Sequence, residues 1–223
     1  MQLVAYGAQD VYLTGNPQIT FFKVVYRRHT NFSMESILQT MNGGQAANGR
    51  STVTVSRNGD LVMGVHMEVN STNDVTSNPS DPLHAIIDNV ELEIGGQKID
   101  KQFGHWMETY TLLTQPNVTG TKPGANELAA KGTVHQRTTA TGGVSAAAIE
   151  DAVYHVPLQF WFCRNAGLAL PLIALQYHEV KINCQWSAKK ADAQDVTIYC
   201  DYVYLDTDER RRFAQVSHEY LIE

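Results

Sequence analysis

The chain has 223 residues, of which 43% are hydrophobic and 18% charged, so it can fill one sandwich core and is not a disordered protein. Its formal net charge of -6 disfavours non-specific binding to nucleic acid, which requires a basic surface. Cys163, Cys184 and Cys200 form no CxxC pair, which argues against zinc and fits a reducing compartment. We expect neither a signal peptide nor a membrane span, because the sequence has no basic leader and no run of ~20 apolar residues.

The first part of the chain predicts an arm followed by strands. Residues 1–17 are rich in turn-forming types and are expected to form an N-terminal arm. Residues 18–38 are rich in β-branched and aromatic types at both ends and predict two strand segments. The basic triplet Arg27-Arg28-His29 lies between them. It is either an anion contact or, as we favour in an acidic chain, a solvated strand edge that prevents mispairing.

Residues 51–70 carry the pattern of a β-hairpin. Two valines, Val53 and Val55, alternate with polar residues, and apolar residues recur at every second position from 61 to 69. Asn58-Gly59 between the two runs is the usual pair for a type I′ turn, which needs positive φ. We therefore predict that the two runs pair with each other.

Residues 86–94 predict another strand, which Gly95-Gly96 turns back into residues 97–100. The segment that follows, residues 105–114, predicts a short helix over one end of the sheets. The residues that recur there at helical spacing are Trp106, Thr109, Tyr110 and Leu113.

Residues 115–150 are rich in Gly, Thr and Ala and poor in large apolar types. A connection of roughly 35 residues is far longer than usual, so we interpret it as one long surface loop of the same domain. Short helical pieces are expected within it at residues 126–131 and 145–151.

Residues 153–186 predict two strands joined by a packed corner. Pro171 lies in the corner and has no N–H to donate, so this middle part is neither a central strand nor a helix interior. In each strand, large apolar residues alternate with other types. They are Val156, Leu158, Phe160 and Phe162 in the first strand and Val180, Ile182, Cys184 and Trp186 in the second.

The chain ends with a predicted strand at residues 196–205 and a predicted short helix within residues 206–223. Acidic residues open that segment and Arg210-Arg211-Arg212 follow, an order that opposes the helix dipole. We favour this capped helix over a nucleic-acid contact for the triplet. The whole pattern is all-β and predicts a single domain over residues 1–223, an antiparallel eight-stranded jelly-roll sandwich with short helices in long loops.

One group of residues has the spacing of a metal site. His66 and Glu68 form the His-x-Glu pair of a facial triad, with His155 or His178 as the third ligand. In such enzymes the ligands line the barrel interior, whereas this pair alternates with apolar residues and should face away from the core. Cys163 is interpreted as core packing and not as a nucleophile. We therefore assign no catalytic, cofactor-binding or metal residue, expect no cofactor, and predict that the chain is not an enzyme.

A lectin-like β-sandwich that binds ligands through its long loop is the alternative function. Three N-glycosylation patterns, at Asn31, Asn70 and Asn117, are interpreted as chance matches because no secretory signal is seen.

Four blocks of uncommon sequence carry a family resemblance. They are GAQDVYLTGNPQITFFKVVYRRHTNFSMESI at 7–37, SRNGDL at 56–61, PLQFWFCRNAGLALPLIALQYHEVKI at 157–182, and DTDERRRFAQVSHEYLIE at 206–223. In this order the blocks resemble major capsid proteins of large icosahedral nucleocytoplasmic double-stranded DNA viruses, the double jelly-roll family.

The resemblance implies a structural role in the virion. Members carry two tandem jelly rolls, and three copies form a pseudo-hexagonal capsomer, a homotrimer, that tiles an icosahedral capsid. This chain corresponds to the N-terminal jelly roll, with residues 206–223 leading toward a second one. The resemblance places residues 115–150 at the outward end of the capsomer and residues 1–17 near its inner base. The implied partners are neighbouring capsomers, minor capsid proteins and an inner membrane, with no direct nucleic-acid contact and with assembly in the host cytoplasm.

Overall fold

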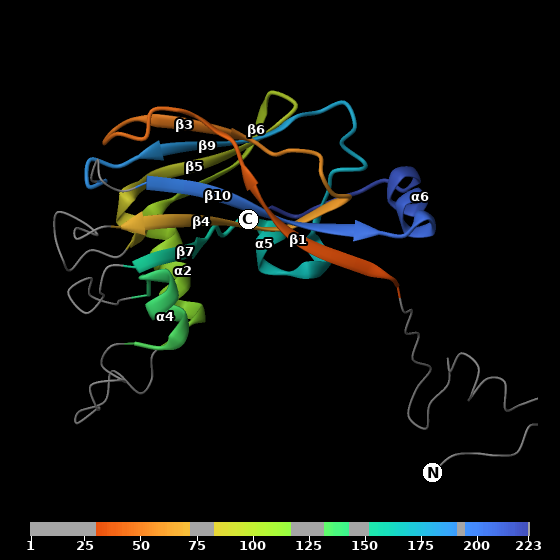
Figure 1. Ribbon diagram of the computed structural model, residues 1–223. Helices are drawn as coiled ribbons and strands as arrows, with labels where there is room; N and C mark the ends of the chain where they lie inside the picture. The colour runs from red at the N-terminus through yellow and green to blue at the C-terminus, as the bar shows by residue number, and fades with distance from the viewer. Residues whose placement is uncertain (1–29, 72–82, 117–131, 143–151, 191–194, 223) are drawn as a thin grey trace, which may run out of the picture. The chain divides into compact units, whose positions relative to one another are not determined.

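The computed structural model describes residues 30–71, 83–116, 132–142, 152–190 and 195–222. The chain divides into two compact units, residues 1–31 and 32–223, and the fold below is that of the second unit. This unit is built of two five-stranded antiparallel sheets that face each other, with helices at the ends of the strands (Figure 1). None of the described helices is long and apolar enough to cross a membrane.

The first sheet has the strand order β1-β10-β4-β7, and β8 also pairs with β4. Its strands are β1 (Phe32–Gln39), β4 (Leu61–Ser71), β7 (Ala152–Pro157), β8 (Leu170–Pro171) and β10 (Asp195–Leu205). The second sheet has the order β2-β3-β9-β5-β6. Its strands are β2 (Met41–Gly43), β3 (Arg50–Thr54), β5 (Ile87–Ile94), β6 (Gln97–Phe103) and β9 (Val180–Trp186). The helices are η1 (Leu83–Ile86), α2 (Gly104–Thr114), α4 (Val134–Thr139), α5 (Trp161–Arg164), η3 (Ala166–Leu168) and α6 (Thr207–Gln215).

The antiparallel jelly roll predicted from the sequence is confirmed, but the described residues form ten strands and not eight. The two extra strands are short, because β2 has three residues and β8 has two. The remaining eight form the four-stranded sheets β1-β10-β4-β7 and β3-β9-β5-β6. Most neighbouring strands, such as β1 and β10 or β3 and β9, come from distant parts of the sequence, as in a jelly roll.

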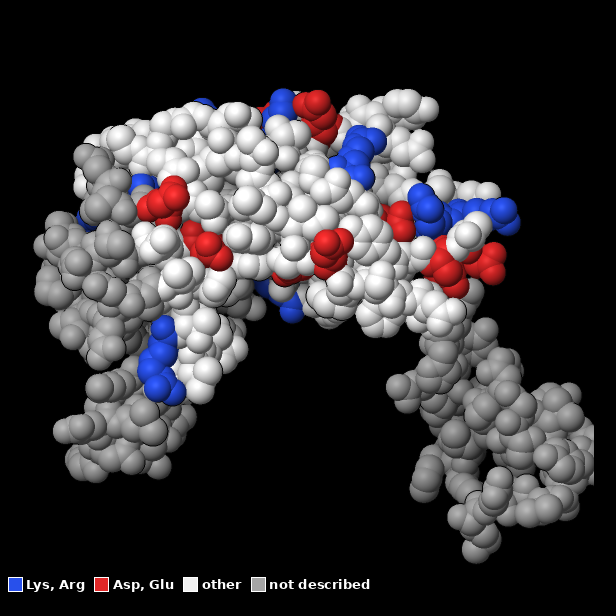
Figure 2. Space-filling view, in the orientation of Figure 1, with Lys and Arg blue, Asp and Glu red and all other residues white. Residues whose placement is uncertain are grey.

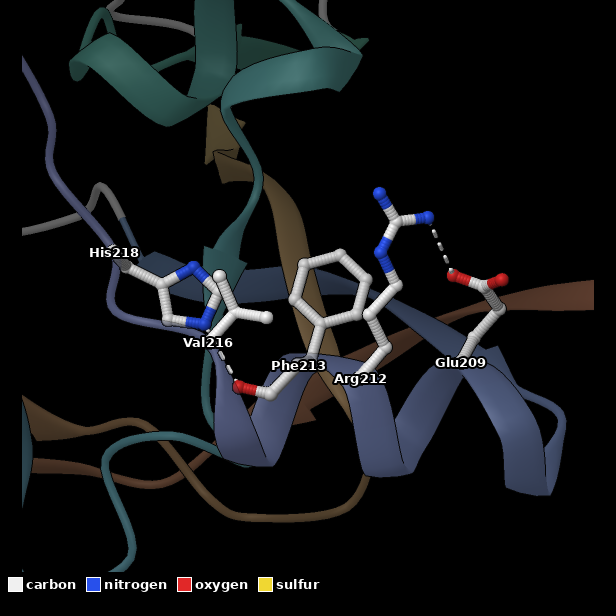
Figure 3. A pocket seen from close by; sticks show the side chains of 5 residues that line it. All are labelled: Glu209, Arg212, Phe213, Val216 and His218. Atoms are coloured by element: carbon white, nitrogen blue, oxygen red, sulfur yellow. Dashed lines mark hydrogen bonds and ion pairs between the residues drawn. The ribbon is translucent and has the colours of Figure 1, made fainter.

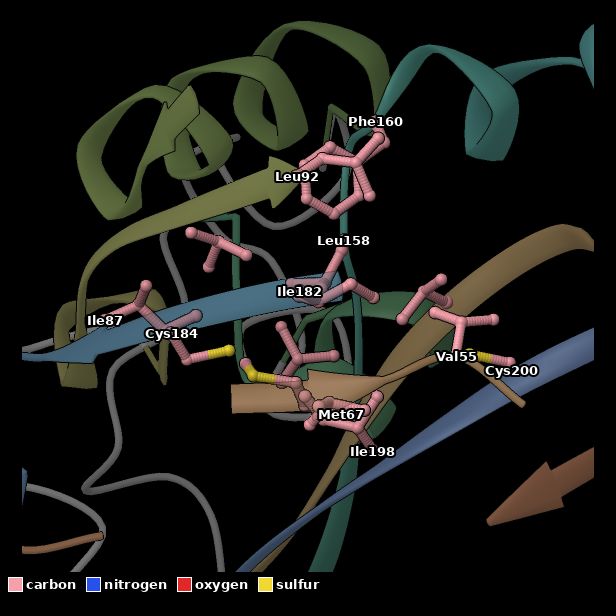
Figure 4. Packing of buried hydrophobic residues seen from close by; sticks show 14 of the residues in the cluster. Val55, Met67, Ile87, Leu92, Leu158, Phe160, Ile182, Cys184, Ile198 and Cys200 are labelled. Atoms are coloured by element: carbon pink, nitrogen blue, oxygen red, sulfur yellow. The ribbon is translucent and has the colours of Figure 1, made fainter. Parts of the chain in front are cut away.

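The core lies between the two sheets and takes alternate side chains from each (Figure 4). Met67 and Ile198 reach inward from the first sheet, and Leu92 and Ile182 reach inward from the second. All four are 0% exposed. Removing such side chains from water stabilises the fold by about 25 cal/mol per Å² of apolar area, which makes this shared layer the main attraction between the sheets.

The hairpin predicted at residues 51–70 is wrong. β3 pairs with β2 and β9 in the second sheet, whereas β4 belongs to the first sheet, so the chain crosses the core between them. Both strands still point alternate residues into one core, which is why the pattern imitates a hairpin. Gly59 is not among the described residues with positive φ. Glycine is needed at this position because Tyr202 packs closely against it. A Cβ on residue 59 would lie 2.8 Å from the Cβ of Tyr202.

The hairpin predicted at Gly95-Gly96 is confirmed. β5 and β6 pair directly, and the two glycines have φ values of 60° and 85°. Both values lie in the left-handed region that a type I′ turn requires.

The strand predicted to run through Phe160 and Phe162 ends earlier. β7 stops at Pro157, and α5 follows, with Phe160 at its N-cap and Phe162 within it; both phenylalanines remain buried. Their rings stack with centroids 5.7 Å apart. The alternation of apolar residues therefore predicted burial correctly and strand geometry wrongly, because a short helix on the sheet edge buries the same side chains.

The helix predicted at residues 105–114 is confirmed as α2. The buried residues are Gly104, Met107 and Thr111. The residues that recur at helical spacing are exposed, except Tyr110, which is partly buried, and Leu113 among them is 74% exposed. Met107 fits over the end of the core, and Gly104 allows the helix to approach η1 closely.

Part of the segment 115–150 is described and contains α4, which the sequence did not predict. Thr133 begins this helix with a capping box shared with Gln136. The helical pieces predicted at residues 126–131 and 145–151 lie outside the described residues, as do the arm 1–17 and the basic triplet at residues 27–29.

Candidate functional site

Three of the four residues with metal-site spacing meet on the outer surface of the first sheet. His66 and Glu68 project from β4, and His155 from β7 lies directly opposite Glu68. The rings of His66 and His155 are 5.7 Å apart, and His155 Nδ1 lies 4.0 Å from a carboxylate oxygen of Glu68. The prediction that His66 and Glu68 face away from the core is confirmed, because the flanking Val65 and Met67 are buried.

His178, the alternative third ligand, lies elsewhere. It precedes β9 in the second sheet, where a Cβ on Gly95 would meet its Nδ1 at 2.6 Å. Within the described ranges, no three His, Cys, Asp or Glu side chains are arranged to hold a metal ion.

Asp201 joins the histidines on this surface and was not found from the sequence. It lies on β10 opposite Gly64 of β4 and Ser36 of β1, beside a β-bulge. Its carboxylate lies 3.7 Å from His66 Nδ1. Hydrogen bonding to His66, and to a smaller extent to Ser36, outweighs partial burial and lowers the pKa of Asp201. The place of this side chain beside His66 follows from the register in which β10 pairs with β4, so no local sequence signal marks it.

A shallow hollow of about 350 Å³ lies next to these side chains, where β4 is paired with neither β7 nor β8. Its lining includes Cys163 and Arg164 from α5 together with His66 and Asp201. The guanidinium of Arg164 lies over the ring of Tyr110 at 4.8 Å, and its Nε donates to the carbonyl of Gln159. The polar and charged side chains around the hollow are able to form hydrogen bonds and ion pairs with another folded surface.

The interpretation of Cys163 as packing is confirmed. Burial raises the pKa of Cys163 and of Cys184 to about 12 and raises the pKa of Cys200 as well. The thiols are free and remain protonated near neutral pH, so they are poor nucleophiles.

The interpretation of residues 206–223 as a capped helix is confirmed for α6. Asp206 accepts a hydrogen bond from the backbone N–H of Glu209 and caps the first turn. Arg210 Nε lies 3.0 Å from a carboxylate oxygen of Asp60, and Arg212 pairs with Glu209. Two of the three arginines are therefore engaged with acidic side chains, which weakens a phosphate-binding interpretation.

The segment after α6 folds back against the domain and encloses a small pocket of about 280 Å³ (Figure 3). His218 stacks on Phe213 with ring centroids 5.6 Å apart, and its Nε2 lies 2.8 Å from the carbonyl oxygen of Phe213. Tyr220 continues toward Trp161 of α5 and donates to the carbonyl of Ala169. Ring stacking thus fixes the direction in which the chain leaves the jelly roll.

The outer surface of the second sheet is polar and internally paired. Glu91 accepts from Lys98 at 2.6 Å and lies within 3.2 Å of Lys101 and 3.7 Å of Arg50. Positive and negative side chains are interspersed on the face shown in Figure 2, without a field of one sign. Such a surface does not match the basic footprint of a nucleic-acid interface.

These features define a class of protein. They are a jelly-roll scaffold, free thiols of which Cys184 and Cys200 are buried in the core, and polar and charged side chains on its outer surfaces. That class is the structural β-sandwich that works by contact with other folded surfaces.

Comparisons with known proteins identify the family. The family described as major capsid protein N-terminus matches residues 20–206. The major capsid protein of Pyramimonas orientalis virus is 53% identical over 232 residues, covering 100% of this chain and 57% of that protein. The major capsid protein of Paramecium bursaria Chlorella virus 1 is 45% identical over 236 residues, covering 100% of this chain and 51% of that protein. The chain belongs to the family of viral major capsid proteins, in the part that forms their N-terminus.

Solved structures agree with this assignment. A chain of the PBCV-1 virus capsid matches with a TM-score of 0.65 and 37% identity, covering 91% of this chain and 49% of that chain. The Faustovirus major capsid protein, at 10% identity and a TM-score of 0.51, shares the fold. The chain spans about half the length of the curated relatives and solved chains that it matches.

Proposed function

We propose that this chain is the N-terminal jelly roll of a major capsid protein and that it builds the icosahedral shell of a large double-stranded DNA virus. The observation that carries the proposal is the match of the whole chain to viral capsid proteins at up to 53% identity, together with the shared fold. In this role three copies form a pseudo-hexagonal capsomer, and capsomers tile the shell.

The physical properties of the domain support a structural role. A shell subunit needs a rigid core, and the two sheets bury one continuous apolar layer. It also needs surfaces that contact neighbours without binding the genome, and an acidic domain with paired surface charges meets that need. Each contact between copies can be weak, because a closed shell makes many contacts effectively intramolecular.

The proposal extends to the parts of the domain. Residues 115–150 face outward on the capsomer, and residues 1–17 lie near its inner base, toward minor capsid proteins or an inner membrane. Residues 206–223 lead toward a second jelly roll. Assembly takes place in the host cytoplasm, which agrees with a sequence that has free cysteines.

Purified virus particles provide the test. Mass spectrometry of intact shell proteins should find this sequence as a dominant component within a polypeptide about twice as long. Antibodies raised against residues 117–131 should label intact particles, and antibodies against residues 1–17 should label them only after disruption. Absence of the sequence from the shell would refute the function. The reverse labelling pattern would refute the orientation alone.

A further inference from the structure

One helix presents its large apolar side chains to solvent. On α2, Trp106, Tyr110 and Leu113 form a stripe, hereafter the α2 face, on the side turned away from the core. Trp106 is 44% exposed and Leu113 is 74% exposed. The rings of Trp106 and Tyr110 lie 6.1 Å apart, and the guanidinium of Arg164 covers Tyr110. An exposed Trp with a partly exposed Tyr and Arg beside it has the composition of an interface hot spot.

The α2 face is held rigidly in place. Met107 and Thr111 are buried on the opposite side of the helix. Glu108 turns inward, where one carboxylate oxygen lies 2.9 Å from His84 Nδ1 and the other accepts the backbone N–H of Gly142 at 2.7 Å. A partner therefore meets a preformed surface and does not have to order it.

The electrostatics of the α2 face indicate what kind of partner fits. Glu108 is the helix's one acidic residue, the helix has no Lys or Arg, and the exposed residues of α2 are uncharged or histidine. A basic partner or a nucleic acid would select a charged surface. Two copies of a chain with a formal net charge of -6 repel each other in general. An apolar patch bordered by two cations, Arg164 over Tyr110 and Lys101 over Phe103, is where this repulsion opposes contact least.

The area of the patch indicates the strength of the contact. Trp106 and Leu113, together with half-exposed Phe103 at the start of the helix, leave roughly 350 Å² of apolar side chain open to water, at roughly 150–250 Å² for each large side chain. This lies within the range of the largest patch on a typical monomer, and such patches are often functional. It is under half of the roughly 800 Å² per partner that a stable pair buries. One such contact is weak alone and becomes effective when a symmetric assembly repeats it.

We propose that the α2 face is a contact surface for a second copy of this chain. The inference rests on the proposed function and deepens it by naming the surface. Trp106 and Leu113 are the anchors of the contact, and Arg164 and Tyr110 form part of its polar rim.

Trp106 provides a direct readout, because it is the exposed tryptophan of the three in the chain. Trp161 is 6% exposed and Trp186 is 1% exposed. We expect sedimentation of the full chain between about 1 µM and about 1 mM, a span that covers weak interfaces, to show self-association. Over the same range, Trp106 fluorescence should shift to the blue and acrylamide should quench it less. A Trp106→Phe chain should keep the association and lose both optical changes.

Matched leucine variants test the anchor. Leu113→Ser should weaken self-association by roughly tenfold or more, because burying a leucine side chain contributes about 1.5–3 kcal/mol. Leu221→Ser, the same change at another exposed leucine, should leave association unchanged. Both positions are on the surface, and circular dichroism should confirm the fold of each variant.

Three outcomes would overturn the inference. Association with Trp106 still fully quenchable would place the contact elsewhere and leave the proposed function standing. A Trp106 that resists quenching at every concentration would show that the same chain covers the α2 face. A monomer at every concentration would refute the contact at the α2 face, whereas the proposed function is tested separately by the presence of the sequence in the shell.

Discussion

Replacing Gly104, at the start of α2, with alanine should change the free energy of unfolding in a direction that depends on the tertiary structure. Replacing an exposed helical glycine with alanine usually stabilises a protein by about 1 kcal/mol, because alanine has the higher helix propensity. Here a Cβ would lie well inside 3.0 Å of the backbone oxygens of His84 and Ile87. Neither oxygen belongs to a flexible side chain, so η1 or α2 must move.

The magnitude follows from those two opposing effects. Overpacking a buried site costs about 1–3 kcal/mol, and two rigid backbone contacts favour the upper end. After the gain in helix propensity, Gly104→Ala should lower the free energy of unfolding by about 2 kcal/mol. For a domain of this size that corresponds to a fall in Tm of about 4–8 °C.

The assay is urea and thermal unfolding of the wild type and two variants. Gly44→Ala is the matched control, because a Cβ at Gly44 meets nothing within 4 Å. It should be neutral or stabilising by less than about 1 kcal/mol, through the unfolded state. A Gly104→Ala chain as stable as Gly44→Ala would refute the close packing of α2 against η1.

Three further predictions concern the core and the outer surface. Ser51→Ala should lower the free energy of unfolding by about 1–3 kcal/mol, because the buried N–H of Trp186, which donates to Ser51 at 2.9 Å, loses its acceptor. Denaturant titration checks this. Cys184, with its pKa raised to about 12 by burial, should resist thiol reagents at pH 8 and react on unfolding; rapid reaction in the folded chain would contradict its burial. Hydrogen bonding to His66 lowers the pKa of Asp201 in the folded chain, so its stabilising effect should be present above the unfolded pKa near 4 and be lost as pH falls through the lower folded value. Asp201→Asn should therefore flatten stability against pH between about 5 and 3, and an unchanged slope would show that this carboxyl is not the cause.

The sequence predicted the strands and their buried faces better than it predicted their partners. Gly95-Gly96 gave the correct hairpin, since positive φ at two glycines is a local property. Asn58-Gly59 gave a false one. The decision between pairing within one sheet and crossing to the other depends on the whole set of strands, and a period of two is the same in both cases.

The prediction of which side chains face outward is limited in the same way, because it also depends on the rest of the fold. The spacing on α2 predicted a helix correctly, but helical spacing does not tell which side meets the core. In the structure the small residues Gly104 and Thr111 are buried, and Trp106 is exposed. Asp201 lies beside His66 because β10 and β4 pair in the register that places Asp201 opposite Gly64, and no short window of sequence contains that register. The spacing of His66 and Glu68, in contrast, was enough to place them outside the core.

The position of β10 has a consequence for how the protein is made. This strand lies between β1 and β4, yet it ends at residue 205, long after both neighbours have left the ribosome. Until it arrives, β1 has no partner among the described strands and β4 has one open edge. Open edges recruit strands from other molecules, and such distant pairing closes slowly. A cell that makes this protein must therefore keep the unfinished sheets of different nascent chains from pairing with one another.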